Sequence, residues 1–168
     1  MFSPQTKALQ KAMSLESIYI FSIRPEYAEA IFSGRKKFEL RRGKGKDLIK
    51  GGLAIVYVSG RVKAILGEFT IGRIIRGPPE KIWRYVRKKN EKGISPESWK
   101  FIAGAKTAIA IEVLSPKLYE KPVSLREIRE VLPTWTPPMG YSKINKNEPI
   151  YQIFLSKLLT SKEVKTEN

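Results

Sequence analysis

The sequence predicts a single α+β domain in which a small, strongly bent sheet or barrel has helices packed outside it. The chain of 168 residues falls in the usual size range of one domain. Its strand-like runs are neither strictly alternated with helical runs nor gathered at one end of the chain. Glycines interrupt the longest strand-like run, which is typical of bulges and barrel corners. The hydrophobic fraction of 42% is sufficient for an apolar core.

Five segments have the residue pattern of strands. Residues 17–23 are rich in β-branched and aromatic side chains and predict a buried first strand. Residues 37–41 alternate polar and apolar side chains, so we expect a half-buried strand there. The other three are residues 53–58, a central strand, residues 62–76, a long strand bent at Gly67 and Gly72, and residues 106–114. Residues 43–52, which hold four glycines among lysines, predict a loop.

Proline and serine signals predict the helices. Pro25 opens a helix that ends at Gly34. Ser124 and Glu127 form a capping box for a helix to about Val131. Further helices are expected from Pro79 to about Lys89, from Pro96 to about Ala103, and from Pro149 through Ile150, Ile153, Phe154, Leu155, Leu158 and Leu159.

The remaining segments are expected to lack regular structure. Residues 133–148 predict a Pro-rich loop. The domain should span residues 17–160, after an N-terminal arm of residues 1–16 and before a frayed C-terminal tail of residues 161–168.

The chain has no histidine and no cysteine. This composition excludes disulfides, zinc sites with His or Cys ligands, cysteine nucleophiles and Ser-His-Asp catalysis. We expect no cofactor and no metal, although a hard-cation site built from carboxylates is compatible with the composition. The longest apolar run, residues 53–58, is far shorter than the roughly 20 residues of a membrane-spanning helix. Residues 1–16 lack the apolar core of a signal peptide, so we expect a cytoplasmic protein without a membrane partner.

The net charge is the most informative global property. The chain has 32 Lys and Arg against 16 Asp and Glu, which gives a net charge of +16 and an isoelectric point near 10.1. Such a charge predicts attraction to polyanions, above all nucleic acid. The alternative is the basic, well-solvated surface of a thermophilic protein.

The densest basic segment is residues 33–50, with eight basic and two acidic side chains. On the predicted strand Lys37, Glu39 and Arg41 share one face, and Lys36 can approach that face from the preceding turn. Glu39 can orient Arg41 as a planar fork for a phosphate or a base edge. The candidate nucleic-acid contacts here are Lys36, Lys37, Arg41, Arg42, Lys44 and Lys46. A solvated strand face, with Glu39 neutralising its neighbours, is the alternative.

Two further segments are candidates for nucleic-acid contact. Arg84, Arg87 and Lys88 lie at i, i+3 and i+4 of a predicted helix and would form a ridge of phosphate contacts. A solvated helix face is the alternative for each of them. In the Pro-rich loop we expect Trp135 to anchor the loop, whereas Tyr141 is a candidate to stack on an unpaired base.

Several of these segments resemble the ASCH domain family. Residues 22–28 and 33–42 look like the opening of that domain, and the family pattern Gly-x-Lys-x-x-Glu-x-Arg is matched by Gly34, Lys36, Glu39 and Arg41. Residues 65–69, 108–112, 125–128 and 137–138 are similar to an archaeal subgroup labelled predicted transcriptional regulators. The resemblance covers roughly residues 18–145 and implies a PUA-like β-barrel of about five to six strands, with a cleft lined by the motif.

The resemblance also implies RNA or a modified nucleoside as the ligand. The first functional prediction is binding of single-stranded or modified RNA through a basic cleft. The alternative is an enzyme that acts on the same ligands with Lys36 and Glu39 as catalytic residues. Members that deacetylate acetylcytidine have a Lys-Thr-Glu arrangement, but Glu39 occupies the Thr position here. In a ribonuclease, Lys36 would stabilise the phosphorane charge and Glu39 would accept the 2′-OH proton, with Tyr57 or Tyr141 as the acid.

A DNA-associated transcriptional regulator is a third prediction, and the lack of a helix-turn-helix pattern counts against it. Because charge alone does not distinguish the two nucleic acids, DNA is an alternative partner to RNA. Glu68 lies on the polar side of the long predicted strand. It either faces the same cleft as Glu39 or is an ordinary exposed strand acid.

Overall fold

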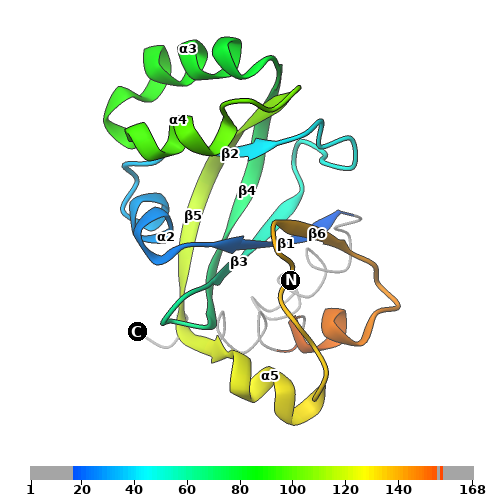
Figure 1. Cartoon of the computed structure of the whole chain (residues 1–168). Coiled ribbons are helices and arrows are strands. Elements are labelled where there is room, and N and C mark those ends of the chain that lie inside the picture. Colours follow the sequence, from blue (N-terminus) through cyan, green and yellow to red (C-terminus); the bar gives the residue numbers. More distant parts are fainter. Residues whose placement is uncertain (1–16, 155, 157–168) are drawn as a thin grey trace, which may run out of the picture.

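A computed structural model describes residues 17–154 and 156, which contain a six-stranded sheet of order β2-β5-β4-β3-β1-β6 (Figure 1). The strands are β1 (Ile18–Ile23), β2 (Phe38–Arg42), β3 (Leu53–Val58), β4 (Ala64–Gly77), β5 (Ala108–Ser124) and β6 (Tyr141–Ile144). β1 and β3 are parallel, and the other neighbouring strands are antiparallel. The predicted arm, the predicted tail, and residues Leu155, Leu158 and Leu159 of the last predicted helix lie outside the described residues.

The helices begin where the sequence signals place them. They are α2 (Pro25–Phe32), α3 (Pro79–Asn90), α4 (Pro96–Ile102) and α5 (Leu125–Val131), with a short 3-10 turn η1 (Glu91–Gly93) and a further helical segment from residue 149. A proline is the first residue of α2, α3 and α4. The Ser124 hydroxyl accepts the Glu127 backbone N–H at 3.0 Å, which confirms the cap of α5.

The two long strands bend the sheet into a half-barrel. In Figure 1, β4 and β5 run from the end of the molecule that carries α3 and α4 to the end that carries α5. Their pairing register shifts at three places, one of them between Ile65 and Gly67. A Cβ atom at Gly67 would lie 2.2 Å from the Lys117 carbonyl oxygen, so only glycine allows this close approach of the strands. The predicted bend at this glycine is thereby confirmed.

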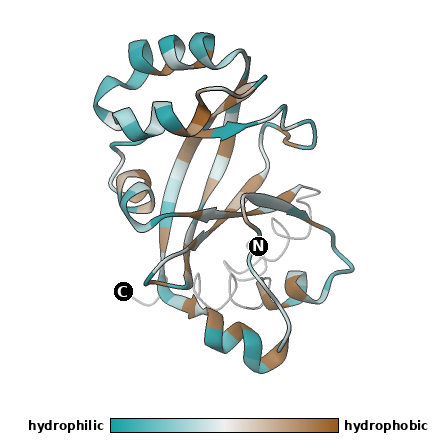
Figure 2. Ribbon diagram, viewed as in Figure 1, coloured by the Kyte–Doolittle hydropathy of each residue, from teal (hydrophilic) through white to brown (hydrophobic). Residues whose placement is uncertain are grey.

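Apolar residues pack on both faces of the sheet. The inner core includes Phe21, Phe69 and Ile111, and α2 contributes Ala28 and Ile31 to it. On the outer face, α3 and α4 cover the β2–β5 end. The other end is covered by α5 and by residues 150, 151 and 154. Figure 2 shows α3 to be hydrophilic along most of its length, as expected of a helix with one buried face. No helix in the described part of the chain is long and apolar enough to cross a membrane.

Three sequence-based expectations about the strands are wrong in detail. The strand predicted for residues 106–114 continues to Ser124, because β4 pairs with it from Ala108 to Ser124. It runs through Pro116 and Pro122, which lie beyond the part paired with β2, where one edge has no described partner. The loop predicted for residues 133–148 contains β6, which is held by pairing with β1. The strand predicted to be half-buried is covered on both faces over Phe38–Arg41, because the end of β1 and Gly140 lie against the charged side chains of its inner face.

Candidate nucleic-acid interface

Three charged residues of the predicted motif meet beneath the surface. The side chains of Lys36, Glu39 and Arg41 are only 4%, 8% and 10% exposed. Glu39 joins the other two: its Oε1 atom lies 2.9 Å from Arg41 Nη2, and its Oε2 atom lies 3.5 Å from Lys36 Nζ. We call these three residues the charged cluster. Two cations and one carboxylate give it one net positive charge in a region of low dielectric, where charges act more strongly than in water.

The register of β2 positions two members of the cluster. Glu39 and Arg41 pair with Ile111 and Ile109 of β5, whose side chains belong to the inner core, so both charged side chains point to the inner face. Lys36 comes from the turn after α2. Its ammonium group donates to the Phe38 carbonyl at 2.6 Å and lies 5.6 Å from the centre of the Tyr27 ring, within reach of a cation–π contact.

Arg41 connects the cluster to the end of β1. Its Nη2 atom also donates to the Ser22 carbonyl at 3.0 Å, and its guanidinium carbon lies 5.4 Å from the centre of the Phe21 ring. Arg41 Nε and Glu39 Oε2 are buried without a hydrogen bond in the described structure. Leaving such groups unsatisfied costs about 1–3 kcal/mol each, so a hydrogen-bond partner for either atom would stabilise the cluster.

The segment between α5 and β6 lies against the cluster. The Ser22 hydroxyl donates to the Pro138 carbonyl at 2.5 Å, and the Ser22 backbone N–H donates to the Gly140 carbonyl at 2.9 Å. A Cβ atom at Gly140 would lie 3.9 Å from Arg41 Nη1, so this glycine is adjacent to the guanidinium. Met139, between these two anchored residues, is fully exposed. An apolar side chain is therefore displayed beside the cationic group.

Tyr141 connects the inner core to the glycine- and lysine-rich loop. Its ring stacks on Phe21, with centres 5.0 Å apart and planes at 19°. Its hydroxyl donates to Asp47 Oδ1 at 2.6 Å, and the Tyr19 hydroxyl donates to the Asp47 backbone carbonyl at 2.5 Å. Burial, followed by the hydrogen bond to Asp47, raises the pKa of Tyr141 well above its ordinary value. Tyr141 is therefore a poor proton donor.

The ASCH domain model matches residues 21–122, which include all three members of the charged cluster. This chain belongs to the ASCH family. A relative from Zymomonas mobilis described as an ASCH domain-containing ribonuclease is 28% identical over 131 residues, covering 77% of this chain and 85% of the relative.

Solved structures share the fold of this ASCH domain. The crystal structure of ASCH from Zymomonas mobilis has a TM-score of 0.68 at 24% identity, over 82% of this chain and 94% of that chain. The N-terminal domain of Staphylothermus marinus McrB has a TM-score of 0.55 at 15% identity, over 86% of this chain and 95% of that domain. The predicted PUA-like β-barrel of about five to six strands is thus confirmed, in the form of a curled half-barrel of six strands.

Other predicted contacts of the ASCH domain lie apart from the charged cluster. Lys37 is exposed and precedes β2, while Arg42 points the other way and donates to the Phe101 and Ala103 carbonyls of the α4 end. The ridge residues Arg84, Arg87 and Lys88 are exposed on α3, on the outer side of the sheet. Within the described residues, no hydrogen bond or ion pair joins these five side chains to those of Lys36, Glu39 or Arg41.

Lys44 and Lys46 are displayed by a loop that the structure holds firmly. Both side chains are at the surface. Arg76 donates to the Lys44 carbonyl at 2.7 Å and to the Gly45 carbonyl at 2.8 Å, and Asp47 is held by the two tyrosines. The composition of the loop indicates only that it lacks regular structure, whereas hydrogen bonds hold its backbone at Lys44, Gly45 and Asp47.

Two predictions about residues that lie on the outer face of the sheet are wrong. Glu68 neither shares a face with Glu39 nor is exposed: it is 6% exposed and pairs with Ile55, which belongs to the outer core. It lies beside Tyr119, whose pKa is raised by burial and by the neighbouring carboxylate. Tyr57 also belongs to the outer core, where its ring meets Trp135 edge-on at 6.2 Å. Tyr57 is therefore not an acid for the cluster, whereas Trp135 anchors its loop as predicted.

Sequence reasoning missed Ser22, Asp47, Met139 and Gly140 as parts of this region. Their residue types are common in loops and strand ends, and only the pairing of distant segments brings them near Arg41 and Tyr141. In the described residues, no group of three or more acidic side chains is placed to hold a metal ion.

Proposed function

We propose that this ASCH domain binds single-stranded RNA, with a phosphate or base edge contacting the Arg41 side of the charged cluster. The observation that carries the proposal is the buried Lys36–Glu39–Arg41 group with one net positive charge, in a protein of net charge +16. Buried ion pairs contribute little to stability compared with apolar residues of the same volume. Binding of a ligand that requires an oriented guanidinium would explain why the chain keeps this buried ion pair.

The surroundings of Arg41 fit a nucleotide. Arg41 is the most exposed of the three members, and Gly140 beside it has no side chain to cover the guanidinium. Met139 offers an apolar surface to a base, while Lys44 and Lys46 offer charges to neighbouring phosphates. One face of the Tyr141 ring stacks on Phe21 and is therefore not free to stack on a base. On that side Tyr141 supports the region instead.

RNA cleavage is the second candidate function, and the relative described as a ribonuclease favours it. Attack of the 2′-OH on the phosphorus would expel the 5′-oxygen and form a cyclic phosphate. Glu39 Oε2, which is buried without a hydrogen bond, would accept the 2′-OH proton. The raised pKa of Tyr141 makes this residue a poor acid. Lys36 would therefore stabilise the phosphorane charge and also donate a proton to the leaving oxygen.

One gel experiment tests both functions. Labelled single-stranded RNA is incubated with the wild-type protein, with and without divalent ions and chelator, and binding and cleavage are followed together. Bound, intact RNA supports the first function, and discrete products that vanish with Lys36→Met support the second. Absence of any complex contradicts the RNA-binding proposal.

The same titration with single-stranded DNA of matched sequence tests the regulator alternative. Tighter binding of DNA than of RNA would favour it. Membership of the archaeal subgroup and a cytoplasmic location remain predictions from the sequence.

A further inference from the structure

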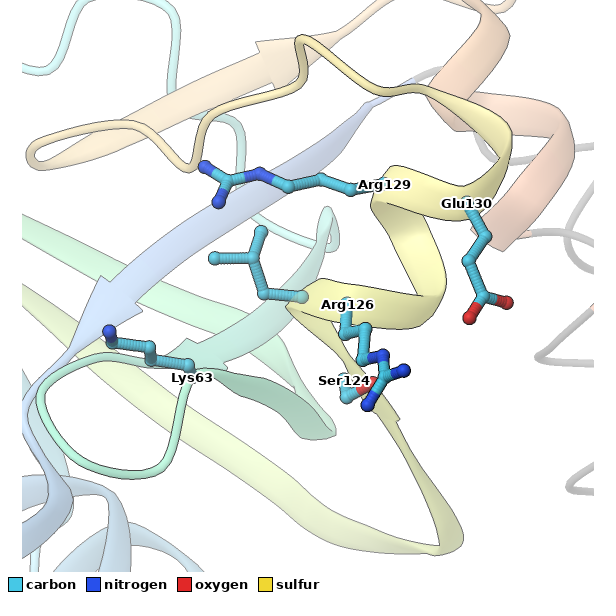
Figure 3. A pocket seen from close by; sticks show the side chains of 6 residues that line it. Lys63, Ser124, Arg126, Arg129 and Glu130 are labelled. Atoms are coloured by element: carbon cyan, nitrogen blue, oxygen red, sulfur yellow. The ribbon is translucent and has the colours of Figure 1, made fainter.

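We propose that a shallow hollow at the α5 end of the molecule holds a second phosphate of the RNA strand that contacts the charged cluster. This inference rests on the proposed function. The hollow has a volume of about 490 Å³ and is lined by Lys63, Ser124, Leu125, Arg126, Arg129 and Glu130 (Figure 3). Three cations and one carboxylate give the lining a net charge of +2, which favours an anion.

In residues 17–154, no ion pair involves Lys63, Arg126 or Arg129. Arg129 donates through Nε to the Trp135 carbonyl at 3.0 Å. Figure 3 shows Lys63 and Arg129 reaching toward the same side of the hollow from two separate elements, the turn before β4 and α5. Two cations from different elements can contact one phosphate group.

The backbone of Lys63 supports a role for its side chain. Its φ angle is +49°, in the left-handed region that glycine and asparagine occupy most easily. The Lys63 carbonyl accepts the Leu125 N–H at 2.9 Å, which attaches this turn to the start of α5. Non-glycine residues held in this conformation cluster at ligand sites. A lysine here places an ammonium group at the hollow despite the backbone cost.

The segment between α5 and β6 connects the hollow to the charged cluster. Arg129 holds it at Trp135, and Ser22 holds it at Pro138 and Gly140, next to Arg41. Five peptide units from Trp135 to Gly140 span at most about 18 Å. One strand of RNA can therefore contact both places. A dinucleotide at the charged cluster is the short ligand for comparison.

Two substitutions test the second phosphate site. Lys63→Gly removes the charge and gives the backbone a residue that accepts its conformation, so the melting temperature should not fall. Arg129→Ala is the second variant, and its melting temperature is measured because the substitution also removes the hydrogen bond to the Trp135 carbonyl. Lys100→Ala, at an exposed position on α4, is the matched control for loss of one charge. Affinity for an RNA octanucleotide and for a dinucleotide is measured at several salt concentrations.

The expected result is a loss of octanucleotide affinity for Lys63→Gly and Arg129→Ala, with the salt slope reduced by about 0.7 for each lost phosphate contact. Lys100→Ala should retain the wild-type slope, and dinucleotide affinity should be the same in all four proteins. An octanucleotide slope that is unchanged, or that falls equally in the Lys100 control, overturns the second site. If the wild-type protein fails to bind the octanucleotide, the proposed function itself has failed.

Discussion

The Glu39 carboxylate and the Arg41 guanidinium, two positions apart on β2, form a 2.9 Å ion pair on the inner face of the half-barrel. The pair is nearly covered, and Lys36 approaches the same carboxylate from the turn before the strand. Arg41 donates a hydrogen bond to β1 and lies beside Gly140 in the segment before β6. The ion pair therefore brings together three parts of the chain that are distant in sequence. This geometry suits a site that presents one oriented guanidinium.

Glu39→Gln should destabilise the fold strongly. The substitution leaves Lys36 and Arg41 buried with no carboxylate between them, and breaking a buried pair in this way costs about 3–5 kcal/mol. RNA affinity of the folded protein should also fall, although the net charge becomes more positive, because Arg41 loses the group that orients it.

Chemical denaturation and RNA titration measure these two effects of Glu39→Gln. The matched control is Glu97→Gln on α4, where the acid is exposed and the change in stability should stay within about 0.5 kcal/mol. Equal stability of the two variants, or tighter RNA binding by folded Glu39→Gln, would place Glu39 outside the site.

The free energy of unfolding should fall at alkaline pH, in part because Tyr141 loses its phenolic proton. Its pKa is raised in the folded protein above the ordinary value of 10.0, so the folded state binds the phenolic proton more tightly than the unfolded state does. The resulting stabilisation is complete below pH 10 and is lost as the pH rises above it.

Tyr141→Phe isolates this contribution. The variant should lose about 0.5–1.5 kcal/mol at neutral pH with its hydrogen bond to Asp47, and should show a smaller further loss above pH 10. Thermal melts of both proteins across this range provide the measurement. Parallel pH profiles would mean that Tyr141 titrates alike in the folded and unfolded chains.

Lys44→Ala and Lys46→Ala should weaken RNA binding modestly and independently of RNA sequence. Both side chains are exposed, so each is expected to act as a phosphate contact worth about 0.7 in the salt slope. For the wild-type protein we expect a slope of about −2 to −4, which corresponds to roughly three to five neutralised phosphates. Salt titrations by fluorescence anisotropy measure the slopes, and a wild-type slope near zero would contradict the electrostatic account.

The local elements of the fold were predictable because their signals are local. Pro25, Pro79 and Pro96 start helices, and the residue pattern of 53–58 gives a buried strand. β6 was missed because its four residues follow a Pro-rich run and are held as a strand by pairing with β1, more than a hundred residues earlier in the chain.

The members of the charged cluster were predictable, but their burial was not. The alternation around Glu39 indicates a polar face, and only the contacts among α2, β1 and the segment before β6 show that this face is covered. Glu68 shows the converse problem: its acidic side chain indicates exposure, whereas the pairing with Ile55 places it in the outer core. The hollow near α5 was missed because Lys63 and Arg129 are far apart in the sequence.

The most direct test of the charged cluster as the RNA site compares two substitutions that both leave the net charge at +16: Arg41→Lys in the cluster and Arg84→Lys on α3. Single-stranded RNA is titrated against each variant and the wild-type protein at one fixed salt concentration, with thermal melts to confirm folding. A lysine cannot reproduce the planar fork, so the account predicts at least a tenfold loss for Arg41→Lys, equivalent to about 1.4 kcal/mol, and wild-type affinity for Arg84→Lys. Equal affinities for a folded Arg41→Lys and a folded Arg84→Lys would contradict it.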